Sequence, residues 1–288
     1  MNKHAYLILA HKNDFTFQTL LKSLDSPNND LYIHMDKKVE DYDINTTNKL
    51  IKFSNIIHTK RTNVQWGGYS GINAEMILFE ESYKSNIDYS FFHLISGEDL
   101  PIKPIEEIYK FFEKNLGKNF IRFQSLNFSY SYRVKYYYFT QDIFGRKKIN
   151  SIINKISLKL QKIFRVNRNN NINFQKGTNW LSITRELVGY ILINKKWIEE
   201  TFKFSFCGDE LFIQTLVFNS KFKETLYYNN YNNNLTSIMR YIDWDRGEPY
   251  VFQKRDFDDL VSKPYLFARK FDSKIDSEII KMIYDYIK

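Results

Sequence analysis

Short apolar runs rich in β-branched and aromatic residues alternate with amphipathic stretches of helical spacing over the first 125 residues. The apolar runs predict strands at 5–10, 30–36, 54–59, 88–96 and 118–123. The amphipathic stretches predict helices at 14–24, 70–85 and 104–115. This alternation is typical of βαβ units. We therefore expect an α/β fold with a Rossmann-like, mostly parallel central sheet flanked by helices.

The ends of the predicted helices carry recognisable signals. Asp14 stands where an N-cap is needed, and Pro104 falls in the first turn of its helix. Ser70 is a plausible cap for the helix that follows it. Later in the chain the pattern predicts helices at 185–194, directly after Gly208 and at 276–287, with short strands between 225 and 253.

The pattern changes between residues 126 and 175, which are first aromatic and then basic. A basic amphipathic stretch there ends in an asparagine run at 169–171. Such a segment is either a solvated excursion or an element that contacts the acceptor or a membrane surface. No repeat and no Gly-, Pro- or Ser-rich linker divides the chain, so we expect a single domain over 1–288.

Charge and cysteine content narrow the choice of function. The formal net charge is +9, which favours acidic partners such as nucleotide phosphates or anionic lipids. No basic run interleaved with stacking aromatics suggests a nucleic-acid module, so we expect no nucleic-acid partner. The single cysteine, Cys207, excludes an internal disulfide framework and a cysteine-based zinc site. The apolar run near the start is too short for a signal peptide, which favours a cytoplasmic location.

Polar residues follow each predicted strand, where ligands of open α/β sheets bind. The segments are "AHK" at 10–12, "HMDKK" at 34–38, "VQWGGYS" at 64–70 and "ISGEDLPIKP" at 95–104. Asp36 either bonds a nucleoside or caps a turn, and "WGGYS" is either a ligand wall or a plain turn. No glycine-rich phosphate loop of the nucleoside triphosphatase or dinucleotide type is present.

A pair of acids, Asp209 and Glu210, stands between Gly208 and an apolar helical run. Both suit the start of a helix, where carboxylates satisfy free N–H groups and the helix dipole. The alternative is that one of them is a general base at the rim of a cleft. In the second case the longer Glu210 would reach a substrate while Asp209 caps the helix.

In order along the chain, the motifs "LILAHK", "IHMDKK", "VQWGGYS", "ISGEDLPIKP", "KGTNWLSITRELVGYIL", "CGDELFIQTL" and "LFARKFD" resemble the core-2/I-branching β-1,6-N-acetylglucosaminyltransferase family, which includes the peptide O-xylosyltransferases. The resemblance spans about 4–272 and is poor at 126–175. In length the chain is similar to the short bacterial members.

The resemblance implies a GT-A fold and inverting transfer of a sugar, most simply N-acetylglucosamine, from a UDP-sugar, with no metal and no other cofactor. Residues 1–125 would then bind the nucleotide sugar, 126–175 would form a variable acceptor-side excursion, and 176–288 would hold the catalytic and acceptor half. By position the family's catalytic base is Glu210. The donor-binding residues by the same comparison are His11, Asp36, Trp66, Arg246 and Lys270, where Arg246 requires a one-residue gap.

The same comparison places Ser96, Glu98, Asp99, Trp180 and Trp244 at the substrate. The expected partners are a UDP-sugar and a glycan or lipid-linked glycan of a bacterial surface polymer, with peripheral contact to the anionic inner face of the cell membrane as a further option. UDP-xylose or another UDP-sugar is the alternative donor. The non-enzymatic alternatives are a nucleotide- or glycan-binding protein and a basic membrane-surface binder.

Overall fold

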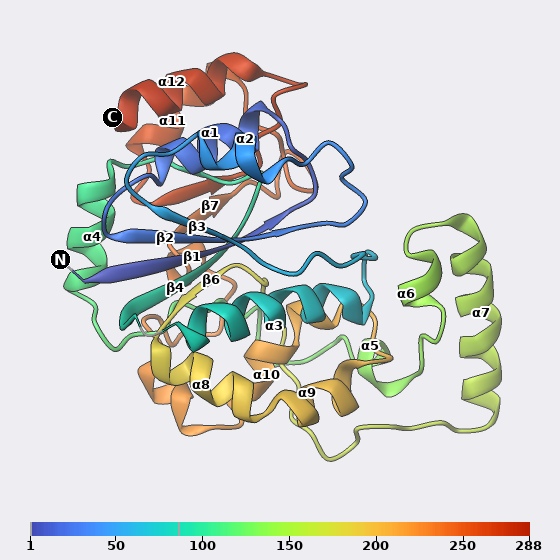
Figure 1. The fold of residues 1–288 in the computed structure, drawn as a ribbon. Coiled ribbons are helices and arrows are strands. Elements are labelled where there is room, and N and C mark those ends of the chain that lie inside the picture. The colour runs from blue at the N-terminus through green and yellow to red at the C-terminus, as the bar shows by residue number, and fades with distance from the viewer. Residues whose placement is uncertain (1, 86) are drawn as a thin grey trace.

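The computed structural model describes residues 2–85 and 87–288. Its main sheet has the strand order β3-β2-β1-β4-β6 (Figure 1). Four strands run parallel, and β6 runs antiparallel to β4. The strands are β1 (Lys3–Ala10), β2 (Asn29–Met35), β3 (Asn55–His58), β4 (Tyr89–Ser96) and β6 (Leu181–Ile183). The expected Rossmann-like, mostly parallel sheet is confirmed.

Helices cover both faces of this sheet (Figure 1). One face packs against α1 (Phe15–Ser23), α4 (Ile105–Glu113), α11 (Phe257–Ser262) and α12 (Ser277–Ile287). The other packs against α3 (Tyr69–Lys84), α8 (Arg185–Ile193), α9 (Lys195–Phe202) and α10 (Phe212–Phe218). Because successive side chains of a strand point to opposite faces, β1 supplies Tyr6 and Ile8 to the first core and Leu7 to the second.

A second, smaller sheet has the order β5-β8-β7. Its strands are β5 (Leu100–Pro101), β7 (Arg240–Ile242) and β8 (Phe267–Arg269). The buried Arg240 joins the two sheets, because its Nη2 donates to the carbonyl oxygens of Leu181 at 2.7 Å and Leu94 at 3.3 Å. This connection holds β7 beside β4 and β6.

One strand prediction is wrong, and the prediction of short strands between 225 and 253 is confirmed only in part. Residues 118–123 form only isolated bridges, of Asn119 with Leu226 and of Phe120 with Ser182. The place beside β4 is taken by β6, which the sequence pattern did not predict as a strand. Between 225 and 253 only β7 is a strand. The part of the chain from 208 to 256 also contains 3-10 turns at Gly208–Glu210, Lys221–Thr225, Leu235–Ser237 and Lys254–Asp256.

Of the predicted helix starts, that of α1 is confirmed and that of α3 is not. Asp14 caps α1 as expected, since its Oδ1 accepts from the backbone N–H of Phe17 at 3.0 Å. The N-cap of α3 is Gly68 and not Ser70. Pro104 is itself the N-cap of α4. A short helix, α2 (Ile44–Asn48), was not predicted.

The segment 126–175 forms α5 (Tyr132–Lys135), α6 (Gln141–Phe144) and α7 (Lys148–Ile163). In Figure 1, α6 and α7 stand apart from the sheet at one side of the molecule. The segment is nevertheless tied to α3, because the Asp142 carboxylate accepts from the backbone N–H groups of Tyr69 and Ser70. Within the described residues, no helix combines the length and the apolar character needed to cross a bilayer.

Candidate active site

A cavity of about 620 Å³ opens at the carboxyl ends of β1, β2 and β4, where ligands of this sheet type bind. We call it the main cleft. Most of the residues that the sequence singled out line it, namely His11, Asp36, Trp66, Ser96, Glu98, Trp180 and Lys270. The others, Asp99, Glu210, Arg246 and Trp244, are not among its lining residues.

Asp36 and Trp66 lie at the part of the main cleft formed after β2 and β3. Asp36 Oδ1 accepts from the backbone N–H of Lys38 at 3.0 Å, so the residue does cap a turn. The carboxylate also faces the cleft, and Lys38 Nζ lies 3.2 Å from Oδ2. The Trp66 side chain is half-exposed, and the guanidinium of Arg146 lies 4.4 Å from its ring centre. Together they offer a flat aromatic face and a hydrogen-bond acceptor.

The buried Glu98 organises the cationic part of the cleft. Its Oε1 binds Lys12 Nζ at 2.7 Å, and its Oε2 binds Lys270 Nζ at 2.9 Å. Burial alone would raise the pKa of Glu98, but hydrogen bonds from His11 and Lys12 lower it well below its usual value. Lys12 also binds Asp272 at 2.7 Å. The carboxylate is therefore charged, and it holds Lys270 at the cleft wall.

Arg269 also lines the main cleft, directly before Lys270. Its guanidinium lies 4.5 Å from the ring centre of Trp180 and 3.6 Å from Asp99 Oδ1. Its Nε and Nη1 are buried and make no hydrogen bond with the described residues. Buried donors without partners are costly unless a ligand or water satisfies them. Arg269 thus has free donor capacity beside Lys270.

Arg246 lies on the loop before Glu248 and Pro249, which do line the main cleft. Its guanidinium pairs with Asp243 and, at 2.7 Å, with Asp256. These bonds hold Arg246 away from the cleft wall. Its expected role at a diphosphate stays a prediction.

Ser96 and Asp99 form the turn after β4. Asp99 accepts from the Ser96 hydroxyl at 2.7 Å and from its backbone N–H at 3.1 Å. The Ser96 hydroxyl in turn accepts from the backbone N–H of Glu98. This closed set of bonds fixes Glu98 against the lysines. Trp244 is half-exposed on the loop that also carries Arg246.

Two further carboxyl groups, Glu75 and Asp209, face the main cleft from α3 and from the turn after Cys207. Apart from the Asn179 side chain, which acts to lower the pKa of Glu75, the oxygens of Glu75 have no hydrogen-bond partner among the described residues. Oδ1 of Asp209 also has none. Burial, and then the charge of Glu210, raise the pKa of Asp209 to about 6. Burial and the charge of Asp209 raise the pKa of Glu75 well above its usual value. The raised pKa favours the neutral carboxylic acid, which can donate a hydrogen bond as well as accept one.

Asp209 does not cap a helix, and that prediction is wrong. Residues 208–210 form a 3-10 turn, and α10 begins only at Phe212 without a side-chain cap. The turn follows Cys207, whose left-handed backbone (φ 48°) directs Asp209 toward the main cleft.

Glu210 points to a different set of neighbours. Its Oε2 accepts from Arg133 at 2.7 Å and lies 3.3 Å from Lys176 Nζ. About a third of the Glu210 side chain is exposed. The structure therefore separates the two acids: Asp209 faces the cleft, and Glu210 lies in a cationic setting beside it.

The described residues contain no group of three or more His, Cys, Asp and Glu side chains placed to hold a metal ion. The sequence had not singled out Glu75, Arg146, Asn179 or Arg269, all of which line the cleft. A signal existed for Glu75, because it stands at helical spacing from Ile72 and Phe79 on the apolar side of α3. A signal also existed for Arg269, which directly precedes Lys270.

A sequence model described as Core-2/I-Branching enzyme matches residues 4–259. The chain belongs to this family. Its relatives include "Xylosyltransferase sqv-6" of Caenorhabditis briggsae, which is 27% identical over 96% of this chain and 35% of the relative. "Xylosyltransferase 2" of Homo sapiens is 23% identical over 97% of this chain and 33% of the relative. The chain thus spans about a third of the length of the curated relatives that it matches.

Among solved structures, the apo form of mouse xyloside xylosyltransferase 1 is similar over 93% of this chain and 97% of that chain. The TM-score is 0.40 and the sequence identity is 9%. The family assignment rests on the sequence match and not on this likeness.

Proposed function

We propose that this member of the core-2/I-branching family transfers a sugar from a UDP-sugar to a hydroxyl group of a glycan, with inversion and without a metal ion. The observation that carries the proposal is the convergence of Asp36, Trp66, Arg269 and Lys270 on one cleft. A carboxylate and an aromatic face suit a uridine. Two adjacent cations suit a diphosphate.

Lys270 and Arg269 supply the charge that stabilises the departing diphosphate. Lys270 is already oriented by Glu98, and Arg269 has donors without partners. Fixed positive charge at the leaving group lowers the barrier because it is present before charge develops. In this proposal the two residues take the part that a divalent ion plays in many sugar transferases.

The identity of the donor sugar is less constrained than that of the nucleotide. The resemblance in sequence favours N-acetylglucosamine, whereas the relatives described above are xylosyltransferases. N-acetylglucosamine carries an acetamido group and a hydroxymethyl group that xylose lacks. We place the sugar against Glu75 and Asp209, whose carboxyl groups line the main cleft and suit sugar hydroxyls.

Glu210 is the proposed catalytic base. Arg133 and Lys176 both bind its Oε2 and fix the carboxylate, while Oε1 makes no hydrogen bond with the described residues. The free oxygen would accept the proton of the acceptor hydroxyl. Asp209 is the second candidate, because it faces the cleft and its pKa of about 6 suits a base near neutral pH.

Nucleotide selectivity tests the proposal without knowledge of the acceptor. Calorimetry in a chelating buffer should show binding of UDP and much weaker binding of ADP, GDP and CMP. The variant Asp36→Asn should reduce the preference for UDP over the other nucleotides. Equal binding of all four nucleotides, or binding of UDP only when manganese is added, would refute the donor site as described.

A further inference from the structure

Helix α7 is oriented with its polar side toward the protein. Asn150 is buried, and its Nδ2 donates to Gln141 Oε1 at 2.8 Å and to the Gly145 carbonyl at 2.7 Å. Gln161, also buried, exchanges two hydrogen bonds with the backbone of Tyr137. A surface helix ordinarily buries its apolar side instead. The apolar side of α7 must therefore face outward.

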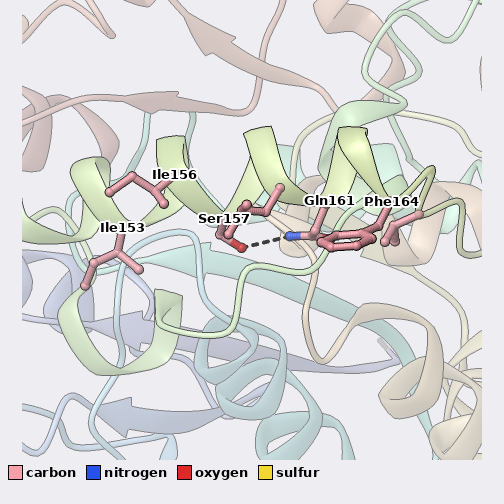
Figure 2. A pocket seen from close by; sticks show the side chains of 7 residues that line it. Ile153, Ile156, Ser157, Gln161 and Phe164 are labelled. Atoms are coloured by element: carbon pink, nitrogen blue, oxygen red, sulfur yellow. Dashed lines mark hydrogen bonds between the residues drawn. The ribbon is translucent and has the colours of Figure 1, made fainter.

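The outward side of α7 is a continuous apolar stripe. Its side chains are 49% to 76% exposed and recur at helical spacing of three and four residues, as Ile149, Ile152, Ile156, Leu160, Ile163 and Phe164. A groove of about 400 Å³ runs along the same helix. Figure 2 shows Ile153, Ile156 and Phe164 along it, with the Gln161–Ser157 hydrogen bond at its polar margin. Contiguous exposed apolar side chains of this extent mark an interaction surface.

The charge around the stripe is of one sign. Residues 143–175 contain eight Lys and Arg and no Asp or Glu, whereas the net charge of the whole chain is +9. At about 100° per residue, Lys148, Lys155, Lys159 and Lys162 fall together along one edge of the stripe. Within the described residues, none of these four lysines forms an ion pair. Their charge is therefore available to a partner.

We propose that α7 docks on an anionic lipid bilayer. The helix lies in the plane of the surface, with the apolar stripe at the boundary of the acyl chains and the lysines at the headgroup phosphates. The joint presence of an apolar stripe and an uncompensated basic edge favours this occupant. A second copy of the chain would bring two basic edges together. A protein partner would need an acidic rim of matching length.

The docked helix would be coupled to the main cleft. Gln141 Nε2, on α6, donates to the Trp66 carbonyl oxygen at 2.7 Å. Asp142 caps the first turn of α3. Docking would therefore hold the cleft at a fixed height above the surface, within reach of an acceptor carried on a lipid. The docking itself does not depend on the proposed sugar transfer.

Co-sedimentation with vesicles tests the proposal on the full chain. The wild-type protein should bind phosphatidylglycerol-containing vesicles, bind pure phosphatidylcholine vesicles far more weakly, and be released as the salt concentration rises. The double variant Lys155→Glu/Lys159→Glu should lose at least about 25-fold in affinity, since each lysine near an anionic surface contributes about fivefold. The variant Ile152→Ser/Ile156→Ser should lose about tenfold or more.

Matched controls lie on α9 and at the end of α8. Lys196→Glu/Lys203→Glu makes the same charge change at two lysines that pair with Glu200 and Glu199. Ile193→Ser removes an isoleucine that is more exposed than Ile152 or Ile156. Both should bind vesicles like the wild type. The proposal is overturned if the wild-type protein does not bind anionic vesicles. It is overturned as well if the α7 variants and the control variants bind vesicles equally. It is also overturned if sedimentation velocity shows instead a dimer that only the α7 variants dissociate.

Discussion

The ammonium group of Lys270 lies 2.9 Å from Oε2 of Glu98 at the wall of the main cleft. Glu98 is itself held by the turn that Ser96 and Asp99 close. The lysine is therefore positioned before any ligand arrives. A diphosphate in the cleft would meet a cation that needs no rearrangement.

We expect Lys270→Ala and Arg269→Ala each to weaken UDP binding by about 1.5 to 3 kcal/mol, the range for hydrogen bonds to charged groups. Calorimetry at constant ionic strength measures the loss. Arg246→Ala is the informative companion: the family resemblance predicts a similar loss, whereas the ion pairs with Asp243 and Asp256 predict almost none. Unchanged UDP affinity in both the Lys270 and the Arg269 variant would show that the diphosphate does not bind at this wall of the main cleft.

Glu210→Gln should preserve the fold and UDP affinity while kcat falls by roughly two to four orders of magnitude, the usual contribution of a positioned base. Gln retains the shape of the side chain and an oxygen for Arg133, but it cannot take up a proton. Single-turnover transfer to a defined acceptor is the appropriate measurement, because it isolates the chemical step.

Asp209→Asn is the matched control for Glu210→Gln, since it makes the same chemical change one residue earlier. We expect a loss of no more than about tenfold, because Asp209 is placed here as a contact of the donor sugar. If instead the Asp209 variant is inactive and the Glu210 variant is active, the base is Asp209.

The free energy of unfolding should depend on pH because Asp209 is buried in the folded protein. Its pKa of about 6 in the folded protein exceeds the ordinary value of 3.8, so the folded state binds more protons between these values. The contribution of Asp209 to stability is therefore favourable in acid and is lost as the pH rises from about 4 to about 6. Relative to the wild type, Asp209→Asn should gain about 2 kcal/mol of unfolding free energy between pH 4 and pH 7. Urea unfolding across that range would show no such gain if the carboxylate is well solvated.

Substitution of Glu75 should change the affinity for the UDP-sugar and not the affinity for UDP. Glu75→Leu should leave UDP affinity unchanged but weaken binding of the correct UDP-sugar by about fivefold to tenfold, the value of a hydrogen bond to a hydroxyl group. Glu75→Gln mimics the neutral acid and should retain most of that affinity. Equal loss of UDP and UDP-sugar affinity in Glu75→Leu would mean a damaged cleft instead of a lost sugar contact.

The parallel sheet was predictable because both faces of β1, β2 and β4 are buried, which leaves near-continuous apolar runs such as "AYLILA". The strand beside β4 was not. "KNFIRF" has stronger strand propensity than "LSI", but tertiary context places Leu181–Ile183 in the sheet and leaves Phe120 only an isolated bridge. Short edge positions of this kind are decided by what packs beside them.

At the site, residues that directly follow strands were predictable, and residues that depend on loop geometry were not. His11, Asp36 and Ser96 reach the main cleft because the ends of parallel strands share one edge of the sheet. Which of Asp209 and Glu210 faces the cleft depends on the left-handed backbone of Cys207. No pattern in the sequence signals that conformation in a residue other than glycine.

Removal of divalent metal should leave UDP binding and turnover intact, because Arg269 and Lys270 supply the positive charge at the diphosphate. Activity measured after exhaustive chelation, and again after manganese is returned, gives the comparison. Activity that appears only with manganese would mean that these two cations do not suffice.

Release of UDP from a panel of UDP-sugars tests the central claim most directly. In chelating buffer the wild-type protein should release UDP from one or a few donors, with UDP-N-acetylglucosamine and UDP-xylose foremost, and Lys270→Ala should release far less. Failure of the folded wild-type protein to release UDP from any donor, with a glycan acceptor present and with or without manganese, would contradict the assignment of this cleft as the site of sugar transfer.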